Sequence, residues 1–350
     1  MLTKYERLGA SSRLRFEQYL PYLTEENIQV TRSPLFSEKY IKDLQHNKRS
    51  LVNILNAYMK RINTLLCIYK FDLIWIEKES LPWLPTIFEI FFYSGVPYIL
   101  DYDDAVFHYY DQNTNPLIKF LLTTKHPVLM KNAAIVIAGN NYIANFAKVS
   151  GAKNVQIIPT VVDMNRYKNS NLRKFQKTNI STIGWVGQRA TSSFLYPLNE
   201  LFQKFSNEGK VKFVAVGIDA GLLGLEMESL PWQEETEVDV IRQFDIGIMP
   251  LSNGLFERGK CGYKLIQYMA CELPVIASPV GINCEIIEHG VNGFLAESSS
   301  EWEVSIRVLL NDSKLRKKMG CAGREKVEKQ YSLEVTAPKL VSILKKTMEN

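Results

Sequence analysis

The 350-residue sequence is poor in the residues that hold metals or form cross-links, with 5 cysteines and 4 histidines. No two cysteines form a CxxC pair, and no histidines join them at zinc-ligand spacing, which argues against a zinc finger or zinc ribbon. An odd number of cysteines also argues against a disulfide framework. The cysteine content therefore favours a reducing compartment, and we expect a cytoplasmic protein.

The sequence also lacks a long apolar run. The nearest candidate, LPTIFEIFFYSGVPYIL at residues 84–100, contains Glu89 and a Gly-Val-Pro break and is too short to span a bilayer. Residues 1–15 contain no apolar signal region. We expect a protein that is either free in the cytoplasm or peripheral on the inner face of the cell membrane.

A strong charge of one sign is absent too, since the net charge is +5 and 23% of the residues are charged. This balance argues against a nucleic-acid partner and against disorder. The excess lies in residues 1–166, where 19 Lys and Arg stand against 15 Asp and Glu. Residues 39–70 are helix-like and basic with interleaved apolar residues, which predicts either an anionic membrane surface or a core-packed helix with solvated cations. The cations concerned are Lys42, His46, Lys48, Arg49, Lys60 and Arg61.

Short apolar, β-branched runs recur along the chain, each followed by a turn and a helix-like stretch. This pattern predicts parallel sheets with crossover helices, and it occurs twice. The strands expected in the first half are Ile28–Thr31, Leu73–Ile76, Tyr98–Asp101, Ala134–Ala138 and Val155–Ile158, after a very short leading segment, Leu2–Tyr5. Those expected in the second half are Ser181–Val186, Lys212–Val216, Asp245–Met249, Pro274–Ala277 and Gly293–Ala296.

The chain is too long for one ordinary core, so we expect two domains. A polar segment without periodicity, residues 163–179, is the predicted linker. The predicted domains are residues 1–168 and 169–332. Residues 333–350 are predicted to form an amphipathic helix, which either folds back on one of the domains or is simply the last helix of the second domain. In such sheets, ligands bind beyond the carboxyl ends of the strands, so polar residues that follow the apolar runs are candidate site residues.

A basic, glycine-containing loop follows the predicted strand Asp245–Met249 and runs into a helix. It contains Arg258, Lys260 and Lys264. The N–H groups at a helix N-terminus attract anions, and cationic side chains strengthen that attraction. The loop therefore predicts a site for a pyrophosphate, and an ordinary loop with solvated cations is the alternative.

The run from Gly259 to Gly281, together with Glu285–Leu295, resembles the donor-binding signature of the family 4 glycosyltransferases. The resemblance implies an α/β GT-B fold, with two Rossmann-like domains whose parallel sheets face a central cleft. It implies a retaining, metal-independent transferase without a cofactor, whose co-substrate is a nucleotide-diphosphate sugar. The implied acceptor is a hydroxyl of a glycan or polyprenyl-linked molecule, in bacterial surface polysaccharide synthesis.

The sequence departs from that signature at its two glutamates. Gly259 and Gln267 occupy their positions, as in a branch with an Arg-Gly-Lys-Cys-Gly loop. Gln267 keeps a carbonyl that accepts a ribose O–H, and Glu257 is a candidate to replace the first glutamate. A second loop, after Ser181–Val186, resembles the family's diphosphate-binding turn, although Thr191 to Ser193 could instead cap a helix. The donor-binding residues that we expect are Gly187, Arg189, Glu257, Arg258, Lys260, Gly262, Tyr263, Lys264 and Gln267.

Carboxylates follow two predicted strands of the first domain. Asp103, Asp104 and Glu77 are the candidate catalytic residues, because a carboxylate there could accept a proton or stabilise positive charge at the anomeric carbon. The alternative for Asp101-x-Asp103 is a metal site, and the alternative for Glu77 is a structural ion pair. The loop after the leading segment resembles an acceptor-binding loop, which makes Ser11, Ser12 and Arg13 candidate acceptor contacts; the alternative is a serine N-cap.

Two other classes of function are weighed against a transferase. The loss of both glutamates favours a non-catalytic nucleotide-sugar-binding protein of the same fold. A dinucleotide oxidoreductase is disfavoured, because no complete Gly-x-Gly-x-x-Gly follows a strand with an acidic residue about twenty positions on.

Overall fold

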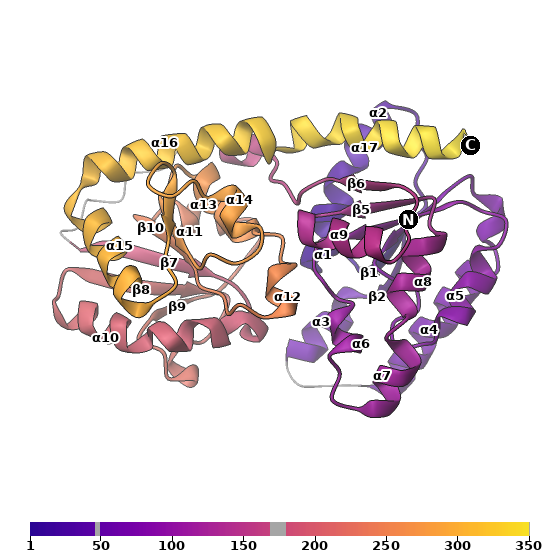
Figure 1. The fold of residues 1–350 in the computed structure, drawn as a ribbon, viewed down its shortest axis with the longest axis horizontal. Coiled ribbons are helices and arrows are strands. Elements are labelled where there is room, and N and C mark those ends of the chain that lie inside the picture. Colours follow the sequence, from indigo (N-terminus) through magenta and orange to yellow (C-terminus); the bar gives the residue numbers. More distant parts are fainter. Residues whose placement is uncertain (46–49, 169–179, 350) are drawn as a thin grey trace. The chain divides into compact units, whose positions relative to one another are not determined.

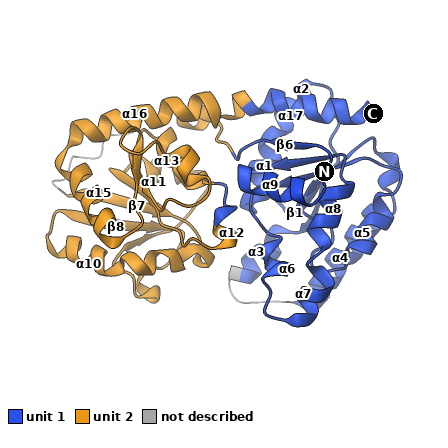
Figure 2. Ribbon diagram, in the orientation of Figure 1, with its two compact units in different colours: residues 1–160, 258–261, 336–350 blue, residues 161–257, 262–335 orange. Residues whose placement is uncertain are grey.

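The computed structural model describes residues 1–45, 50–168 and 180–349. Most of the predicted linker, residues 169–179, lies outside the described residues, as do His46, Lys48 and Arg49 of the basic segment. The chain forms two compact units (Figure 2). Unit 1 comprises residues 1–160, 258–261 and 336–350, and unit 2 comprises residues 161–257 and 262–335. The chain therefore first passes from unit 1 to unit 2 after Thr160, whereas we expected the boundary at residue 168.

Unit 1 contains, within the described residues, a six-stranded parallel sheet with the strand order β2-β1-β3-β4-β5-β6 (Figure 1). Its central strands are buried on both faces, as helical crossovers require. The strands are β1 (Leu2–Tyr5), β2 (Ser33–Phe36), β3 (Ile74–Glu77), β4 (Tyr98–Tyr102), β5 (Ile135–Ala138) and β6 (Val155–Ile157).

Helices connect the strands of unit 1, and the C-terminal helix α17 (Leu333–Met348) packs mainly with this unit. Tyr19 Oη and Thr336 Oγ1 lie 3.0 Å apart, and Lys345 donates to Glu26 at 2.7 Å. The other helices are α1 (Ala10–Arg15), η1 (Glu17–Tyr19), α2 (Leu20–Glu25), α3 (Glu38–Gln45), α4 (Leu51–Leu65), η2 (Ile68–Lys70), α5 (Thr86–Tyr93), α6 (His108–Asp111), α7 (Pro116–Leu122), α8 (Lys125–Asn132) and α9 (Asn141–Val149).

One predicted strand of unit 1 is wrong. Residues 28–31 form no strand. The strand that pairs with β1 is β2, which begins two residues later. β2 contains Pro34, which lacks an N–H for the ladder, and an edge strand tolerates proline because one of its sides needs no partner. Because of this proline, the sequence pattern did not predict the strand.

Unit 2 contains, within the described residues, a second six-stranded parallel sheet, with the order β12-β11-β10-β7-β8-β9. The edge strand β9 was not predicted, because it is short and largely exposed. The strands are β7 (Ser181–Val186), β8 (Val211–Val216), β9 (Glu228–Leu230), β10 (Ile246–Met249), β11 (Val275–Ala277) and β12 (Gly293–Leu295).

The helices of unit 2 cover both faces of its sheet. Glycines allow close packing there: a Cβ on Gly184 of β7 would lie 2.0 Å from the ring of Phe244. The helices are η3 (Met164–Tyr167), η4 (Arg189–Leu198), α10 (Asn199–Asn207), η5 (Gly221–Leu223), α11 (Glu237–Ile241), α12 (Leu255–Arg258), α13 (Tyr263–Ala270), α14 (Asn283–Ile286), α15 (Ser299–Asn311) and α16 (Ser313–Gln330).

The predicted fold class is confirmed, because each unit is a Rossmann-like α/β domain with a parallel sheet. In the part of the chain that the structure describes, no helix is both long and apolar enough to cross a membrane.

Candidate functional site

In unit 2, two predicted donor-binding residues meet around a tryptophan. Gly187 follows β7, and a Cβ on it would lie 2.3 Å from the ring of Trp185. The ammonium group of Lys264 lies 5.4 Å from the centre of the same ring, a cation–π arrangement. Trp185 itself is buried. The sequence analysis placed Gly187 and Lys264 at one site but missed the tryptophan that connects them.

Helix α13 begins at the same edge of the unit 2 sheet. Its N-cap, Gly262, has a φ of +66°, and a Cβ there would lie 2.5 Å from Ile286, so both backbone and packing require glycine. As a glycine, Gly262 has no side chain with which to cap this N-terminus. The partial positive charge at the start of α13 and the ammonium of Lys264 together suit an anion. Tyr263 is the first residue of the helix and is partly buried.

Gln267 lies one turn along α13 from Tyr263 and is buried. Its Nε2 atom has no hydrogen-bond partner among the described residues. A buried amide without a partner is uncommon, because each missing hydrogen bond costs about 1–3 kcal/mol. Gln267 therefore has a donor to offer a ligand, in addition to the carbonyl acceptor that we expected from the sequence.

The other predicted residues of unit 2, Arg189 and Glu257, lie in η4 and α12. Arg189 is exposed at the start of η4, where Thr191 Oγ1 donates to the carbonyl of Gln188 at 3.0 Å. Glu257 folds over the backbone of Gly254, since a Cβ on that glycine would lie 2.2 Å from Glu257 Oε2.

The remaining predicted donor-binding residues are in the segment that packs with unit 1. Asn140, which follows β5, donates from Nδ2 to the carbonyls of Gly259 (2.9 Å) and Lys260 (3.1 Å). A Cβ on Gly259 would lie 2.3 Å from Cβ of Ala105, so close packing explains glycine at this position. Lys260 Nζ lies 4.0 Å from Asp104 Oδ2, and Arg258 is exposed.

In unit 1, Glu77 ends β3 and ties the first loop of the chain to the sheet. Its Oε2 atom accepts hydrogen bonds from the backbone N–H of Lys4 (2.9 Å) and from the hydroxyl of Ser12 (2.6 Å). Ser12 in turn accepts from the backbone N–H of Tyr5 at 3.2 Å. Glu77 and Ser12 are buried, and their contacts position the loop.

Lys78 forms an ion pair with Asp103, one of the three predicted catalytic carboxylates. Its ammonium lies 2.7 Å from Asp103 Oδ1 and donates to Ser11 Oγ at 3.0 Å. Burial opposes the charge of Asp103, but Lys78, Ser11 and Arg15 together outweigh burial and lower the pKa of Asp103 to about 2. Such a carboxylate is a weak base that still stabilises positive charge. Asp104 is partly exposed, which makes it the more accessible carboxylate after β4.

Asp101 has a structural partner. Arg15 donates from Nε to Asp101 Oδ1 at 2.8 Å and from Nη1 to the carbonyl of Ile158 at 2.7 Å, and Trp75 Nε1 donates to Asp101 Oδ2 at 3.3 Å. Burial opposes the charge of Arg15, and Asp101 raises its pKa. The two carboxylates of Asp101-x-Asp103 are thus each paired with a cation. The described residues contain no group of three His, Cys, Asp or Glu that could hold a metal ion.

The alternative for this loop, a serine N-cap, is wrong. Helix α1 is capped by Gly9 without a side-chain hydrogen bond, while Ser11 and Ser12 bond to Lys78 and Glu77. Arg13 is buried and donates from Nη1 to the carbonyl of Arg7 at 3.2 Å. Of the three predicted acceptor contacts, only Ser11 is partly accessible.

A buried charge network in unit 1 had no signal in the sequence. The ammonium of Lys125 lies 2.7 Å from Glu79 and 2.8 Å from Glu89, which is the acid inside the apolar run 84–100. Beside it, the Nδ1 atom of His126 lies 2.8 Å from the hydroxyl of Tyr102. These charges lie in the loop after β3, on α5 and on α8, so spacing along the chain could not pair them.

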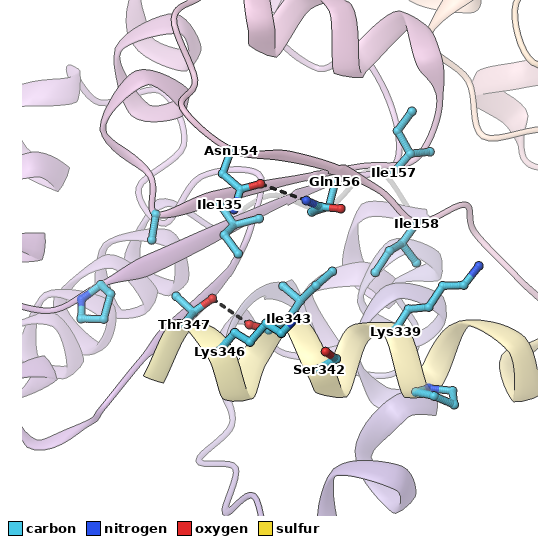
Figure 3. A pocket seen from close by; sticks show the side chains of 13 residues that line it. Ile135, Asn154, Gln156, Ile157, Ile158, Lys339, Ser342, Ile343, Lys346 and Thr347 are labelled. Atoms are coloured by element: carbon cyan, nitrogen blue, oxygen red, sulfur yellow. Dashed lines mark hydrogen bonds between the residues drawn. The ribbon is translucent and has the colours of Figure 1, made fainter. Parts of the chain in front are cut away.

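A cavity of about 850 Å³ lies in unit 1 between α17 and the strands β5 and β6 (Figure 3). Lys339, Ser342 and Lys346 reach it from the helix, and Asn154 and Gln156 reach it from the β6 side. It contains none of the predicted site residues.

The sequence of unit 2 matches a known family. Residues 180–312 match the family model described as glycosyl transferases, group 1. A curated relative, N-acetyl-alpha-D-glucosaminyl L-malate synthase of Bacillus anthracis, is 37% identical over 82 residues, which are 23% of this chain. The chain aligns with only about a fifth (22%) of that protein's length.

Two solved structures resemble the whole chain. Anabaena HepE, in complex with UDP, has a TM-score of 0.70 at 15% identity, covering 99% of this chain and 98% of HepE. WaaG, a glycosyltransferase involved in lipopolysaccharide biosynthesis, has a TM-score of 0.69 at 16% identity, covering 98% of this chain and 99% of WaaG. At these identities the likeness establishes the GT-B fold.

Proposed function

We propose that this protein is a retaining, metal-independent glycosyltransferase of family 4, which transfers a sugar from a nucleotide-diphosphate sugar to a hydroxyl of a glycan or polyprenyl-linked acceptor. The observation that carries the proposal is the anion-binding arrangement of unit 2 within the region that matches the glycosyl transferase model. HepE, which has the same fold, binds UDP. A role in bacterial surface polysaccharide synthesis is part of the proposal.

In this proposal the donor diphosphate binds at the N-terminus of α13. Lys264 and the partial positive charge at the start of α13 neutralise its charge, and no cofactor is needed. Gln267 offers its buried Nε2 and its carbonyl to the ribose hydroxyls. Arg258 and Lys260 act as further phosphate ligands, with Tyr263, Gly187, Arg189 and Glu257 completing the donor contacts.

Unit 1 supplies the acceptor side. Asp104 is the candidate base for the acceptor hydroxyl. Asp103 is less suited to this role, because its ion pair with Lys78 lowers its pKa and makes it a weak base. Glu77 positions Ser12 and the first loop, where Ser11 and Arg13 are the other proposed acceptor contacts. No residue is assigned as a covalent nucleophile.

The donor site is tested by ligand-induced stabilisation. A nucleoside diphosphate at a hundred times its dissociation constant should stabilise the folded chain by about 2.7 kcal/mol, which a thermal-shift screen detects. The double variant Lys264→Ala/Arg258→Ala should lose this stabilisation. Lys317→Ala/Lys318→Ala, on the exposed face of α16, is the matched control and should keep it. Equal stabilisation of all three proteins would contradict the donor site.

A second function, nucleotide-sugar binding without catalysis, is favoured by Gly259 and Gln267 in place of the family's glutamates. Turnover separates the two functions. Incubation with labelled nucleotide sugars and a membrane extract should release the nucleotide above background hydrolysis. Asp104→Asn should reduce this release while leaving the thermal shift unchanged, and binding without release would favour the second function.

A further inference from the structure

The cavity of about 850 Å³ beside α17 is separate from the residues assigned to sugar transfer, and the residues that line it all belong to unit 1. Its volume is in the range of small-molecule binding sites, about 300–1,000 Å³. Helix α17 forms one wall, and the opposite wall consists of β5, β6 and the residues just before β4, β5 and β6 (Figure 3). We call this space the α17 cavity.

One side of α17 lines the cavity. The residues concerned recur at spacings of three and four, which places them in one stripe along the helix. They are Lys339, Ser342, Ile343, Lys346 and Thr347. A neighbouring stripe, which contains Leu340, Val341 and Leu344, is buried. The helix is therefore fixed to the protein by a different side from the one that lines the cavity.

The strand wall of the cavity is largely aliphatic. Ile135 of β5 is 7% exposed and Ile158, just after β6, is 3% exposed, whereas Ile157 of the edge strand β6 is 46% exposed. Among the described residues that line the cavity there is no aromatic ring, so a nucleotide base would have nothing to stack on. This wall suits an aliphatic group and makes the cavity a poor site for a nucleotide.

Hydrogen-bond donors reach the cavity from both walls. On the β6 side, Gln156 Nε2 donates to Asn154 Oδ1 at 3.0 Å. This bond uses the acceptor of Asn154, whose Nδ2 atom is a further donor. On the α17 side, Lys339 and Lys346 contribute ammonium groups, and Ser342 contributes a hydroxyl. Ammonium, amide and hydroxyl donors beside aliphatic side chains suit the oxygens of an anionic group attached to an apolar body.

The charges that line the cavity have one sign. Among the described residues no Asp or Glu lines it, and residues 112–162, which include β5 and β6, contain neither. The carboxylates closest along α17, Glu334 and Glu349, are exposed at the two ends of the helix and do not line the cavity. Lys345, which does not line it either, pairs with Glu26 of α2 at 2.7 Å. A cavity lined by cations and by no carboxylate attracts an anion.

The position of Lys339 strengthens this argument. A lysine near the C-terminus of a helix is ordinary, because it suits the partial negative charge there. That reason applies to Lys346, in the last turn of α17, but not to Lys339, near the middle of the helix. The two lysines are two turns apart, roughly 10 Å, and Ser342 lies between them. One anionic group beside Ser342 is therefore within reach of all three side chains.

We propose that the α17 cavity binds a small amphipathic anion, a carboxylate or phosphate carried on an aliphatic body. The anionic group lies beside Ser342 with Lys339 and Lys346, and the body packs against Ile135 and Ile157 of the strand wall. A ligand that contacts both walls fastens α17 to the sheet of unit 1. The cavity is thus a binding site separate from sugar transfer, and its ligand controls how firmly the C-terminal helix is held.

Calorimetric titration of the full chain tests the charge and the apolar body separately. Octanoate and octyl phosphate carry the two anionic groups, and at least one of them should bind at a single site with a dissociation constant of about 1 mM or tighter. Octylammonium has the same body with the opposite charge, and inorganic phosphate has no body. Each of these two should bind at least about tenfold more weakly than the better octyl anion.

Two variants at exposed positions of α17 connect this binding to the cavity. Lys339→Gln/Lys346→Gln should weaken binding of the better octyl anion by about tenfold, because it removes both ammonium groups. Ser342→Trp should abolish binding, because the indole fills the space between the two lysines. The matched controls are Lys317→Gln/Lys318→Gln and Ser300→Trp, at exposed positions of unit 2, and both should bind like the parent.

Hydrogen exchange shows where the anion binds. The better octyl anion should slow amide exchange in α17 and in β6, and leave exchange in α15 and α16 unchanged. The proposal is overturned if neither octyl anion binds, if octylammonium binds as tightly, if binding survives Ser342→Trp, or if the slowed amides lie only in other elements. Ser342→Trp should keep the thermal shift with nucleoside diphosphates, so this proposal and the proposed function can fail independently.

Discussion

Buried ion pairs distinguish unit 1 from unit 2 among the described residues. Unit 1 buries ion pairs, such as Arg15–Asp101 and Lys125–Glu89, in which no side chain is more than 2% exposed. Unit 2 places its pairs on the outer helices, where Arg307 bonds to Glu208 and Glu303. Solvent ions screen an exposed pair but do not reach a buried one, so the two kinds of pair should respond differently to mutation and to salt.

Among the variants that test this comparison, Lys125→Met should change the free energy of unfolding the most. Lys125→Met should lower the free energy of unfolding by about 3–5 kcal/mol, because Glu89 would be left buried without its counter-charge. Urea unfolding followed by circular dichroism measures this loss. The control Lys329→Met removes the exposed Lys329–Glu325 pair of α16 and should change the midpoint little.

A second variant keeps the test of Lys125 informative if the single variant does not fold. Lys125→Met/Glu89→Gln removes both charges and leaves an acceptor for the backbone N–H of Ser80. It should recover much of the lost stability. An equal loss in the double variant would show that the charge of Glu89 does not cause the effect.

The next largest effect is the dependence of the unfolding free energy on pH. Burial, with a smaller contribution from Lys125, lowers the pKa of His126 from 6.5 to about 3. Between these two values the unfolded chain binds a proton that the folded chain does not, so stability falls as the pH falls through 6.5. At pH 5 the loss from this group should be about 2 kcal/mol, and His126→Asn should remove it.

His289 of unit 2 is the matched control for this prediction, because it is exposed. His289→Asn should leave the difference in unfolding free energy between pH 7 and pH 5 unchanged. Comparing the slopes of the variants removes the contributions of other groups, such as Asp101. A His126→Asn slope equal to that of the parent would mean that His126 takes up its proton at the same pH in the folded and the unfolded chain.

Much of the fold could be predicted from the sequence, because parallel strands buried on both faces are continuous apolar runs. β7 was predicted at its observed bounds, and β3, β4, β5 and β10 within one residue. The failures have physical reasons. The run Ile28–Thr31 is partly exposed and unpaired, and the true edge strand β2 contains Pro34.

The candidate site was only partly predictable, because strand ends locate side chains but do not pair them. Glu77, Asp103 and Gly187 lie at strand ends, as we expected. The ion pair between Lys78 and Asp103 was not predicted. Lys78 has a φ of +62°, which is uncommon for a residue other than glycine. Glu237 is buried and accepts from Trp232 Nε1 at 2.7 Å, a contact that spacing along the chain does not reveal.

The smallest effect should be found in the ion pairs of unit 2. Arg307→Gln removes contacts to Glu208 and Glu303 on the exposed side of α15, and these charges are screened by salt. We expect a small decrease of the urea midpoint at about 0.1 M salt, which disappears at about 1 M, where the Debye length is about 3 Å. The deficit of Lys125→Met should persist at both salt concentrations, because ions do not reach that pair. A deficit of Arg307→Gln that also survives high salt would show that packing of Arg307 over Phe205, at 4.7 Å, stabilises unit 2 more than the charges do.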